Sequence, residues 1–444
     1  MQIQLSDHFT MDRLLRFTLP TIAMMVFTSV YIVVDGFFVS NFTGKTAFAA
    51  VNLIMPFLLL LSTVGFMFGT GGSALVAKTL GEGDREKANR LFSLCVFTAV
   101  AVGILFALLG NVLIRPFVVF LGADGGLLEN AVLYGRIVLA SLPFFVSQLL
   151  FTVFFVTAEK PKLGLAVTIL AGMTNIVLDA VLVLSLPQEY KLMGAAAATA
   201  VSEVLGGTVP LVYFASKNCS LLRLGRTSFD GEALRRACIN GSSEFMSNVS
   251  VNIVGMLYNI QLLKYAGENG VAAYGVMLYV SMIFSGVCMG YSIGVAPVIS
   301  FHDGAKNYGE LKELLRKSLF LICCSGLTMM TAAQVFARTL AYVFVAYDDA
   351  LMELTVSGFR IYAVSFLFMD FAIFGSGFFT ALNDGLTSAL ISFMRTMVFQ
   401  VSCVLILPAF FGLTGIWSSD VVAECMAALM TLGFMAVKRK KYHY

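Results

Sequence analysis

The chain has 444 residues, of which 59% are hydrophobic and only 12% charged, about half the charged fraction of a typical soluble protein. Its net charge of +3 offers no broad basic surface for nucleic acid, and its eight Cys form no C-x-x-C pair that would indicate a zinc site. These values exclude a soluble enzyme, a nucleic-acid-binding protein and a secreted module. They predict a polytopic membrane protein.

A transmembrane helix needs about 20 largely apolar residues. Twelve such runs lie between charged or turn-rich breaks. They cover residues 17–39, 47–77, 91–114, 131–157, 163–186, 193–215, 238–263, 271–300, 318–346, 354–381, 386–411 and 413–436. The first run follows a polar start and contains no small-residue cleavage site, so we expect no cleaved signal peptide.

The basic residues orient these spans. If the N-terminus is cytoplasmic, about three times as many Lys and Arg fall on the cytoplasmic side as on the outer side. Since twelve is an even number of spans, both termini are expected in the cytoplasm.

The second half of the chain resembles the first. A shift of 223 residues places Gly71 on Gly294 and Gly81 on Gly304, and it also aligns the basic loops that follow. We therefore predict an N-lobe at 1–215, a cytoplasmic linker at 216–237 and a C-lobe at 238–444. Six spans per half predict two six-helix bundles, related by a pseudo-twofold axis along the membrane normal, with a V-shaped central cavity between them.

Four polar residues of the predicted N-lobe should lie at one depth. At about 1.5 Å per residue, Asp35 lies about 27 Å and Asp179 about 24 Å from the cytoplasmic side, while Thr199 lies about 9 Å below the outer surface. Asn175 shares a helix face with Asp179. Such an oxygen-rich cluster suits Na⁺, and two mutually repelling acids could instead bind a proton. A cluster that only holds helices together is the alternative.

Further ionisable residues in the spans are candidates for the cavity or a substrate site, because charges in hydrocarbon are costly. These candidates are Asp370, Glu203, Glu244, Glu424 and Arg395. Asp370 has aromatic neighbours and could bind a cationic substrate, whereas Glu244 lies near a span end. Pro20 removes a backbone hydrogen bond in span one and is a candidate hinge.

Several motifs resemble the multidrug and toxic compound extrusion (MATE) transporters, over essentially the whole chain. The motifs are RFTLPTIAMMVFTSVYIVVDGFFV, GEGDREKAN, MTNIVLDAVLV and GAAAATAVSE in the first half, and NIQLLKYAGENGVAAYGV and APVISFHDGAKNYGELKELLRKS in the second. The second-half motifs are similar to the MepA-like and DinF-like bacterial branches. The resemblance implies twelve helices and drug export driven by inward H⁺ or Na⁺, with no other cofactor.

The resemblance also implies site roles. Asp35, Asn175, Asp179 and Thr199 match the polar N-lobe cluster to which the family's cation coupling is attributed. Asp370 matches a C-lobe cation residue of one branch, but Asn252 and Ile253 stand where that branch has a Glu. The resemblance therefore favours the N-lobe.

We compare three functions for such a membrane protein. The first is an antiporter of the bacterial cytoplasmic membrane, a monomer in lipid with small drug-like substrates and no nucleic acid. The second is a flippase or exporter of a lipid-linked or metabolite substrate on the same scaffold, disfavoured because Arg395 is the one base well inside a span. The third, an intramembrane enzyme, lacks an H-E-x-x-H or G-x-S-x-G motif.

Overall fold

The computed structural model describes residues 3–345 and 348–444, and within them every regular element is a helix. The long helices are listed here in chain order. They are α1 (Met11–Phe42), α2 (Lys45–Gly81), α3 (Arg85–Phe120), α4 (Gly125–Thr157), α5 (Pro161–Ser185), α6 (Lys191–Ala215), α7 (Gly231–Gly304), α8 (Tyr308–Val345), α9 (Asp349–Tyr362), α10 (Phe366–Ala381), α11 (Gly385–Phe393) and α12 (Val401–Tyr442). Three short helices join them: η1 (Gln188–Tyr190), η2 (Ala363–Ser365) and the π-helix η3 (Met394–Gln400).

Polar side chains mark the beginnings of several helices. Thr10, Asp84, Asp230 and Asp348 each accept a hydrogen bond from a backbone N–H in the first turn of the helix that follows. Such caps satisfy donors that have no partner within the helix. The apolar runs between them are long enough for helices, which satisfy every backbone group within one segment inside hydrocarbon.

Ten helical stretches in the described part of the chain are long and apolar enough to cross a membrane. Two of them contain a break at a glycine in the left-handed region. Gly267 (φ 61°) divides α7, and Gly412 (φ 58°) divides α12, at backbone angles that a residue with a Cβ rarely adopts. Division at these two glycines gives twelve helical stretches that match the twelve predicted spans. Their bounds lie within seven residues of the predicted ones, except that α8 begins ten residues before 318 and the predicted end of that span, residue 346, lies outside the described residues.

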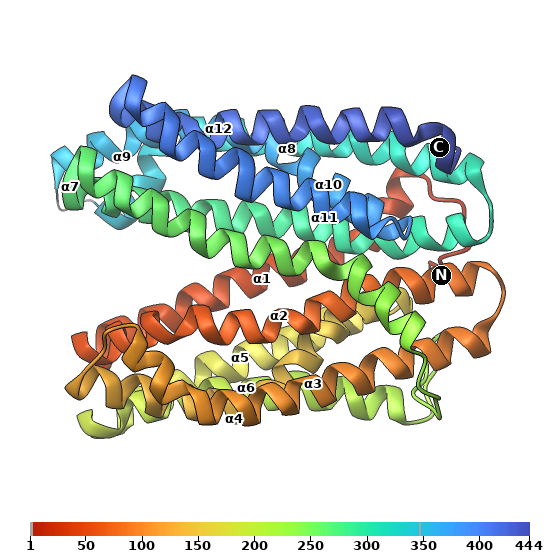
Figure 1. Cartoon of the computed structure of the whole chain (residues 1–444), viewed down its shortest axis with the longest axis horizontal. Coiled ribbons are helices and arrows are strands. Elements are labelled where there is room, and N and C mark those ends of the chain that lie inside the picture. Colours follow the sequence, from red (N-terminus) through yellow and green to blue (C-terminus); the bar gives the residue numbers. More distant parts are fainter. Residues whose placement is uncertain (1–2, 346–347) are drawn as a thin grey trace.

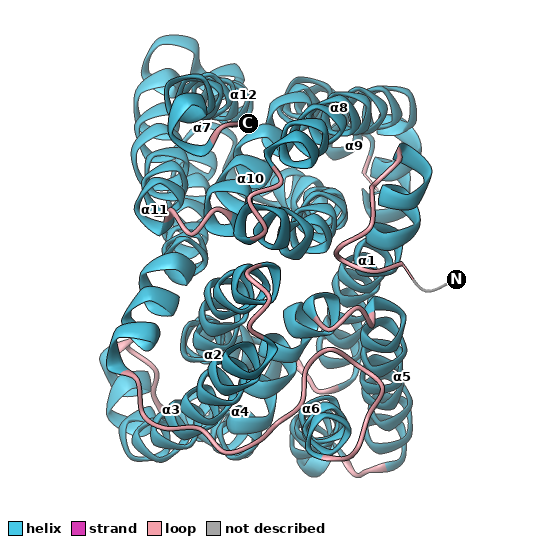
Figure 2. Cartoon of the chain, turned by 90° about the vertical axis from the view of Figure 1, so that its right-hand side faces the viewer, coloured by secondary structure: helices cyan, strands magenta, loops and turns pink. Residues whose placement is uncertain are grey.

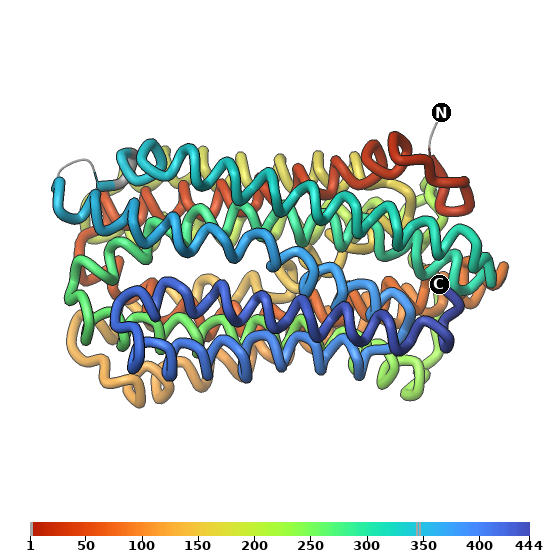
Figure 3. The backbone as a smooth tube through the Cα atoms, turned by 90° about the horizontal axis from the view of Figure 1, so that it is seen from above, coloured from red at the N-terminus to blue at the C-terminus, as the bar shows by residue number. Residues whose placement is uncertain are grey.

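The helices form two lobes, as predicted. Figure 1 shows α1–α6 in one lobe and α7–α12 in the other, with both termini at one end of the molecule. Figure 2, which looks onto that end, and Figure 3, seen from above, show the helices of both lobes running along the same long axis. The pseudo-symmetric, all-helical fold predicted from the sequence is confirmed.

Two related glycines, Gly81 and Gly304, make a close contact between the lobes. A Cβ on Gly81 of α2 would lie 2.0 Å from the carbonyl oxygen of Phe301 in α7, and a Cβ on Gly304 of α7 would lie 2.1 Å from the carbonyl oxygen of Lys78 in α2. The 223-residue shift relates Gly81 to Gly304 and Lys78 to Phe301. The contact is thus self-complementary, as at a twofold axis.

Helix α1 also lies at the lobe interface. A Cβ on Gly290 of α7 would lie 2.5 Å from the Cα of Ile22, and the Ser29 hydroxyl donates to the Met282 carbonyl of α7 at 3.2 Å. Any change in the packing of α1 therefore acts directly on the C-lobe.

The segment between the lobes differs from the predicted linker 216–237. Helix α7 begins at Gly231, so the last seven residues of that stretch form its first turns. The residues before it lie along α3: Arg85 donates to the carbonyls of Ser220 and Leu221, and the Arg223 N–H donates to Asn89. The connection is fixed to the N-lobe by hydrogen bonds.

Candidate functional site

The N-lobe brings together three of the four polar residues proposed for ion coupling. The carboxyl group of Asp35, from α1, lies within hydrogen-bonding reach of Asp179 and Asn175, both from α5. Asp179 is fully buried and Asn175 is 3% exposed. One helical turn separates the two α5 residues, which places both side chains toward α1.

The aspartate pair has too few donors for its acceptors. With both acids ionised, no donor in the described residues reaches Asp35 Oδ1, Asn175 Oδ1 or either oxygen of Asp179. Two carboxylates in a site of low dielectric repel each other strongly. A shared proton relieves this repulsion, and so does a small cation such as Na⁺, which these oxygens suit.

Thr199 is connected to the two aspartates through Tyr134. Its hydroxyl hydrogen-bonds the Ala195 carbonyl at 3.2 Å and the side chain of Tyr134 from α4. Tyr134 is fully buried and lies close enough to Asp35 and Asp179 to interact electrostatically with both carboxyl groups. Sequence reasoning missed Tyr134, since a tyrosine in an apolar span carries no signal of the helix it faces.

Glu203 of α6 is bound within its own lobe. Its carboxylate accepts a hydrogen bond from the Ser141 hydroxyl of α4 at 2.6 Å, and the residue is 6% exposed. It lies near Asp35. It therefore belongs to the interior of the N-lobe.

The C-lobe contains a cavity of about 470 Å³. Its walls come from α7, the end of α9, α10, the end of α11, η3 and α12. Three of the predicted candidates line it, namely Glu244, Arg395 and Glu424, together with polar and aromatic residues that include Tyr258, Tyr274, Ser281, Tyr362, Gln400 and Asp420.

A charged cluster forms one wall of this C-lobe cavity. Arg395 donates from Nη2 to Glu424 at 2.7 Å and from Nε to both carboxylate oxygens at 2.9 Å. Gln400 donates to Asp420 at 2.9 Å. Arg395 and Gln400 lie five residues apart in the π-helix η3, and i to i+5 bonding places such residues on one face.

Asp420 is a residue that the sequence analysis missed. The available signal was its spacing: Asp420 and Glu424 lie four residues apart in an apolar run, as Asn175 and Asp179 do. Asp370, which was predicted, is 3% exposed and has one carboxylate oxygen with no hydrogen-bond partner among the described residues. It is not among the residues that line the C-lobe cavity.

The candidate hinge Pro20 lies within α1, which continues through it as one helix. Its neighbours Thr21 and Ile22 lie opposite Gly290 of α7. The proline is thus beside the lobe interface and below the aspartate pair.

An N-terminal strap, residues 3–10, crosses between the lobes at the end that holds the termini. The Leu5 N–H donates to Glu159 of the N-lobe at 2.6 Å, and the Phe9 N–H donates to Glu310 of α8 at 2.8 Å. Leu5 and Phe9 are fully buried. They belong to one apolar cluster with residues of both lobes, among them Val153 and Leu311.

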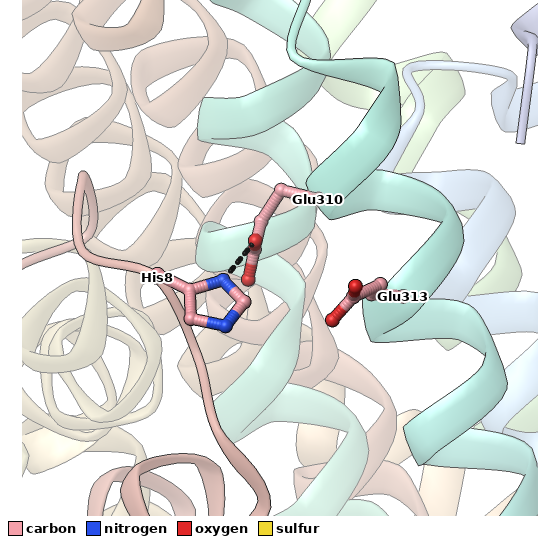
Figure 4. Close-up of side chains that lie close together, drawn as sticks. All are labelled: His8, Glu310 and Glu313. Atoms are coloured by element: carbon pink, nitrogen blue, oxygen red, sulfur yellow. Dashed lines mark hydrogen bonds and ion pairs between the residues drawn. The ribbon is translucent and has the colours of Figure 1, made fainter.

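His8, Glu310 and Glu313 lie close together beside the strap (Figure 4). His8 Nδ1 lies 2.6 Å from Glu310, while Glu313 pairs with Lys317 at 2.6 Å. Each acid thus has a basic partner, and His8 and Glu313 are more than half exposed. We assign this group a structural role and no metal.

Comparisons with known proteins agree with this architecture. The MatE family model matches the chain twice, at residues 20–181 and 245–406. The multidrug export protein MepA of Staphylococcus haemolyticus is 23% identical over 420 residues, covering 94% of this chain and 92% of that protein. MepA of Staphylococcus aureus (strain MRSA252) is 22% identical over 421 residues, with the same coverage.

Solved structures share the fold. A MATE protein in complex with MaL6 superposes with a TM-score of 0.92 at 22% identity, covering 98% of both chains. An outward-facing multidrug resistance MATE family transporter of the MOP superfamily gives 0.92 at 22% identity, covering 98% of this chain and 97% of that one. Since the family model matches well over half of the residues, in one copy per lobe, the chain belongs to the MatE family of membrane transporters.

Proposed function

We propose that this transporter exports amphipathic, often cationic small molecules in exchange for H⁺ or Na⁺. The single observation that carries the proposal is the Asp35–Asp179 pair, whose facing carboxyl groups require a proton or cation. The multidrug export activity named for the MepA relatives supports the direction and the substrate class.

The exchange depends on α1. In the state open to the outside, a proton or Na⁺ bound by Asp35 and Asp179 removes their repulsion, and α1 and α5 pack more closely. Because α1 contacts α7 through Ile22 and Ser29, its movement around Pro20 changes the cavity between the lobes. Drug affinity falls, the drug leaves, and the cation is released inward as the lobes rock. The ion drives this only through its different affinity for the two states.

We further propose that the protein lies in the bacterial cytoplasmic membrane as a monomer, with both termini in the cytoplasm and no nucleic acid partner. The basic residues at the end that holds the termini support this orientation. They include Lys438, Arg439, Lys440 and Lys441 at the end of α12.

Export of a lipid-linked or metabolite substrate on the same scaffold is less well supported. A pyrophosphate needs several unpaired cations within the cavity. The base deepest in the C-lobe, Arg395, is already paired with Glu424 at 2.7 Å. The acids Glu244 and Asp420 line the same C-lobe cavity and would repel an anionic headgroup.

Ethidium uptake into inverted membrane vesicles tests the proposed function. One set of vesicles has an acidic lumen and a second has a Na⁺-rich lumen, each with wild-type protein or Asp35→Asn. Asp12→Asn is the matched control, since Asp12 lies on the same helix and is two-thirds exposed. We expect uptake with one gradient, lost in Asp35→Asn and kept in Asp12→Asn. No uptake with either gradient by folded wild-type protein contradicts the proposal.

A further inference from the structure

Glu203 of α6 is a carboxyl group inside the N-lobe without a basic partner. It is 6% exposed and lies 2.6 Å from the Ser141 hydroxyl of α4. Among the described residues no Lys, Arg or His forms an ion pair with it. The titratable groups that share this part of the interior are Tyr31 and Asp35 of α1, Tyr134 of α4 and Asp179 of α5. None of them is a base, and a buried charge without a partner is costly.

The equivalent acid of the C-lobe does have a basic partner. Glu424 lies 221 residues after Glu203, close to the 223-residue shift between the lobes, and each acid belongs to the last helix of its lobe. Arg395 donates to Glu424 at 2.7 Å and 2.9 Å. In the N-lobe, the 221-residue shift places Thr174 at the position of Arg395, and the 223-residue shift places Gly172 there. The guanidinium thus holds the C-lobe acid as a carboxylate, whereas the N-lobe acid is free to change its charge.

The Ser141 hydroxyl can bond Glu203 in both of its charge states. The Ser141 oxygen lies 2.6 Å from a Glu203 carboxyl oxygen and 2.9 Å from the Val138 carbonyl oxygen, but a hydroxyl has only one hydrogen to donate. When Glu203 is ionised, Ser141 donates to the carboxylate. When Glu203 is protonated, the acid O–H donates to the Ser141 oxygen, and Ser141 donates to the Val138 carbonyl. Rotation of one hydroxyl therefore satisfies either form without movement of the backbone.

We propose that Glu203 is a second ion site of the N-lobe, which takes up and releases one proton separately from the Asp35–Asp179 pair. Uptake forms one O–H bond on the Glu203 carboxylate and neutralises one negative charge. A proton is the cation that fits, because the site offers one carboxylate and one hydroxyl, whereas hard metal cations take about six oxygens. This inference rests on the proposed ion exchange, to which it adds a residue and a further proton.

The charge of Glu203 acts on the aspartate pair. Glu203 interacts electrostatically with Asp35, and the Tyr31 side chain interacts with both of these carboxyl groups. An ionised Glu203 strengthens cation binding at the pair, and a proton on Glu203 removes that attraction. By reciprocity, an ion at the pair weakens proton binding at Glu203 by the same factor. A proton on Glu203 thus promotes release of the ion from the pair.

Infrared difference spectra of the purified full-length protein in detergent, between acid and alkaline pH, test the inference without transport. A protonated carboxylic acid has a C=O stretch that a carboxylate lacks, so each acid that exchanges its proton gives a band. A buried acid gives its band at higher frequency than an acid bonded to water. We expect one buried-acid band to be lost in Glu203→Gln and kept in Asp35→Asn. Glu189→Gln is the matched control, since Glu189 is exposed in η1 of the same lobe, and it should keep the band.

Ser141→Ala is a test that leaves Glu203 in place. The protonated acid then loses the oxygen to which it donates, so we expect its C=O stretch to move to higher frequency. This variant decides the outcome if Glu203→Gln does not fold. An unchanged band in Ser141→Ala, or the same spectrum in wild type and Glu203→Gln, overturns the inference. A Glu203 band that persists at every pH also overturns it, because the proton is then structural and is not exchanged.

Transport separates this inference from the proposed function. In inverted vesicles with an acidic lumen, one proton fewer per cycle should lower the final ethidium accumulation of Glu203→Gln by about tenfold for each pH unit of gradient, the equivalent of about 1.4 kcal/mol. If wild-type vesicles transport ethidium and Glu203→Gln reaches the same accumulation, the second proton site is wrong and the proposed function stands. If the Glu203 band behaves as expected but wild-type vesicles transport nothing with either gradient, the proposed function is wrong.

Discussion

Lys78 of α2 and Asp303 of α7 form an ion pair of 2.8 Å across the lobe interface. Asp303 is 9% exposed and Lys78 35% exposed. The pair lies beside the contact of Gly81 with Phe301 and of Gly304 with Lys78. It therefore fastens the lobes at the end of the molecule that holds both termini.

Replacement of Lys78 by Gln leaves the largely buried carboxylate of Asp303 without its partner. We expect the closed arrangement at this end to lose roughly 1 kcal/mol relative to the open one, because the pair is partly screened by solvent. Spin labels at the exposed positions Glu82 and Lys306 report the distance between the lobes. A larger fraction of long distances is expected in Lys78→Gln, and the charge swap Lys78→Asp with Asp303→Lys should restore the short ones. Identical distance distributions in all variants contradict the assignment.

A methyl group at either related glycine should separate the lobes. Gly81→Ala and Gly304→Ala each place a Cβ about 2 Å from a backbone carbonyl oxygen, a contact that no side-chain rotation relieves. We expect each to shift the same spin-label distances toward longer values and to cost about 1–3 kcal/mol, as overpacking does. Gly433→Ala is the control, since nothing lies within 4 Å of its Cβ position. A normal distance distribution in either glycine variant shows that the contact is looser than described.

Arg395 and Glu424 should behave as one unit in stability. Arg395→Gln leaves Glu424, 1% exposed, as an uncompensated buried charge, and loss of one partner of such a pair costs about 3–5 kcal/mol. The double variant Arg395→Gln with Glu424→Gln should recover most of this loss. Thermal unfolding in detergent measures the loss in the single variant and its recovery in the double variant as changes in Tm. Equal Tm values for the single and double variants mean that the pair is not coupled.

The junction of α10 with α11 should be sensitive to acid. Burial opposes ionisation of Asp384, but hydrogen bonds from Lys438, Tyr442 and Thr387 outweigh it and hold the pKa of this carboxyl below its usual value. A depressed pKa stabilises the folded state above the unfolded pKa near 4, and this contribution is lost as the pH falls through the folded pKa. We expect Asp384→Asn to lower Tm at pH 7, and the difference from wild type to shrink below pH 4. A constant difference across pH contradicts the ionic contribution.

The spans could be predicted from the sequence because the backbone N–H and C=O groups of a long apolar segment must be hydrogen-bonded within the membrane, and a helix achieves this within one segment. The breaks at Gly267 and Gly412 fell in the predicted gaps between spans, since glycine tolerates the left-handed backbone there. Helix α7 begins seven residues before the predicted apolar span 238–263, because its first turns are polar and the Asp230 cap, not hydrophobicity, fixes where the helix begins.

The candidate sites could be predicted only in part. The depth of Asp35 and Asp179 follows from counting residues along two helices, so their proximity was expected. Which neighbour a side chain meets depends on helix rotation and on packing across lobes, and a single sequence does not contain that information. This is why Tyr134 and the partners of Asp420 were missed. The role predicted for Asp370, which is buried and does not line the C-lobe cavity, stays a prediction.

The N-terminal strap affects the balance between the closed and open arrangements of the lobes at the end that holds the termini. Leu5 and Phe9 are withdrawn from water by walls that both lobes supply, and burial of each side chain contributes about 1.5–3 kcal/mol. When the lobes part at this end, both side chains return to water. The strap of residues 3–10 thus stabilises the arrangement in which the lobes are closed at the end that holds the termini, and part of the free energy needed to open this end is set outside the binding cavities.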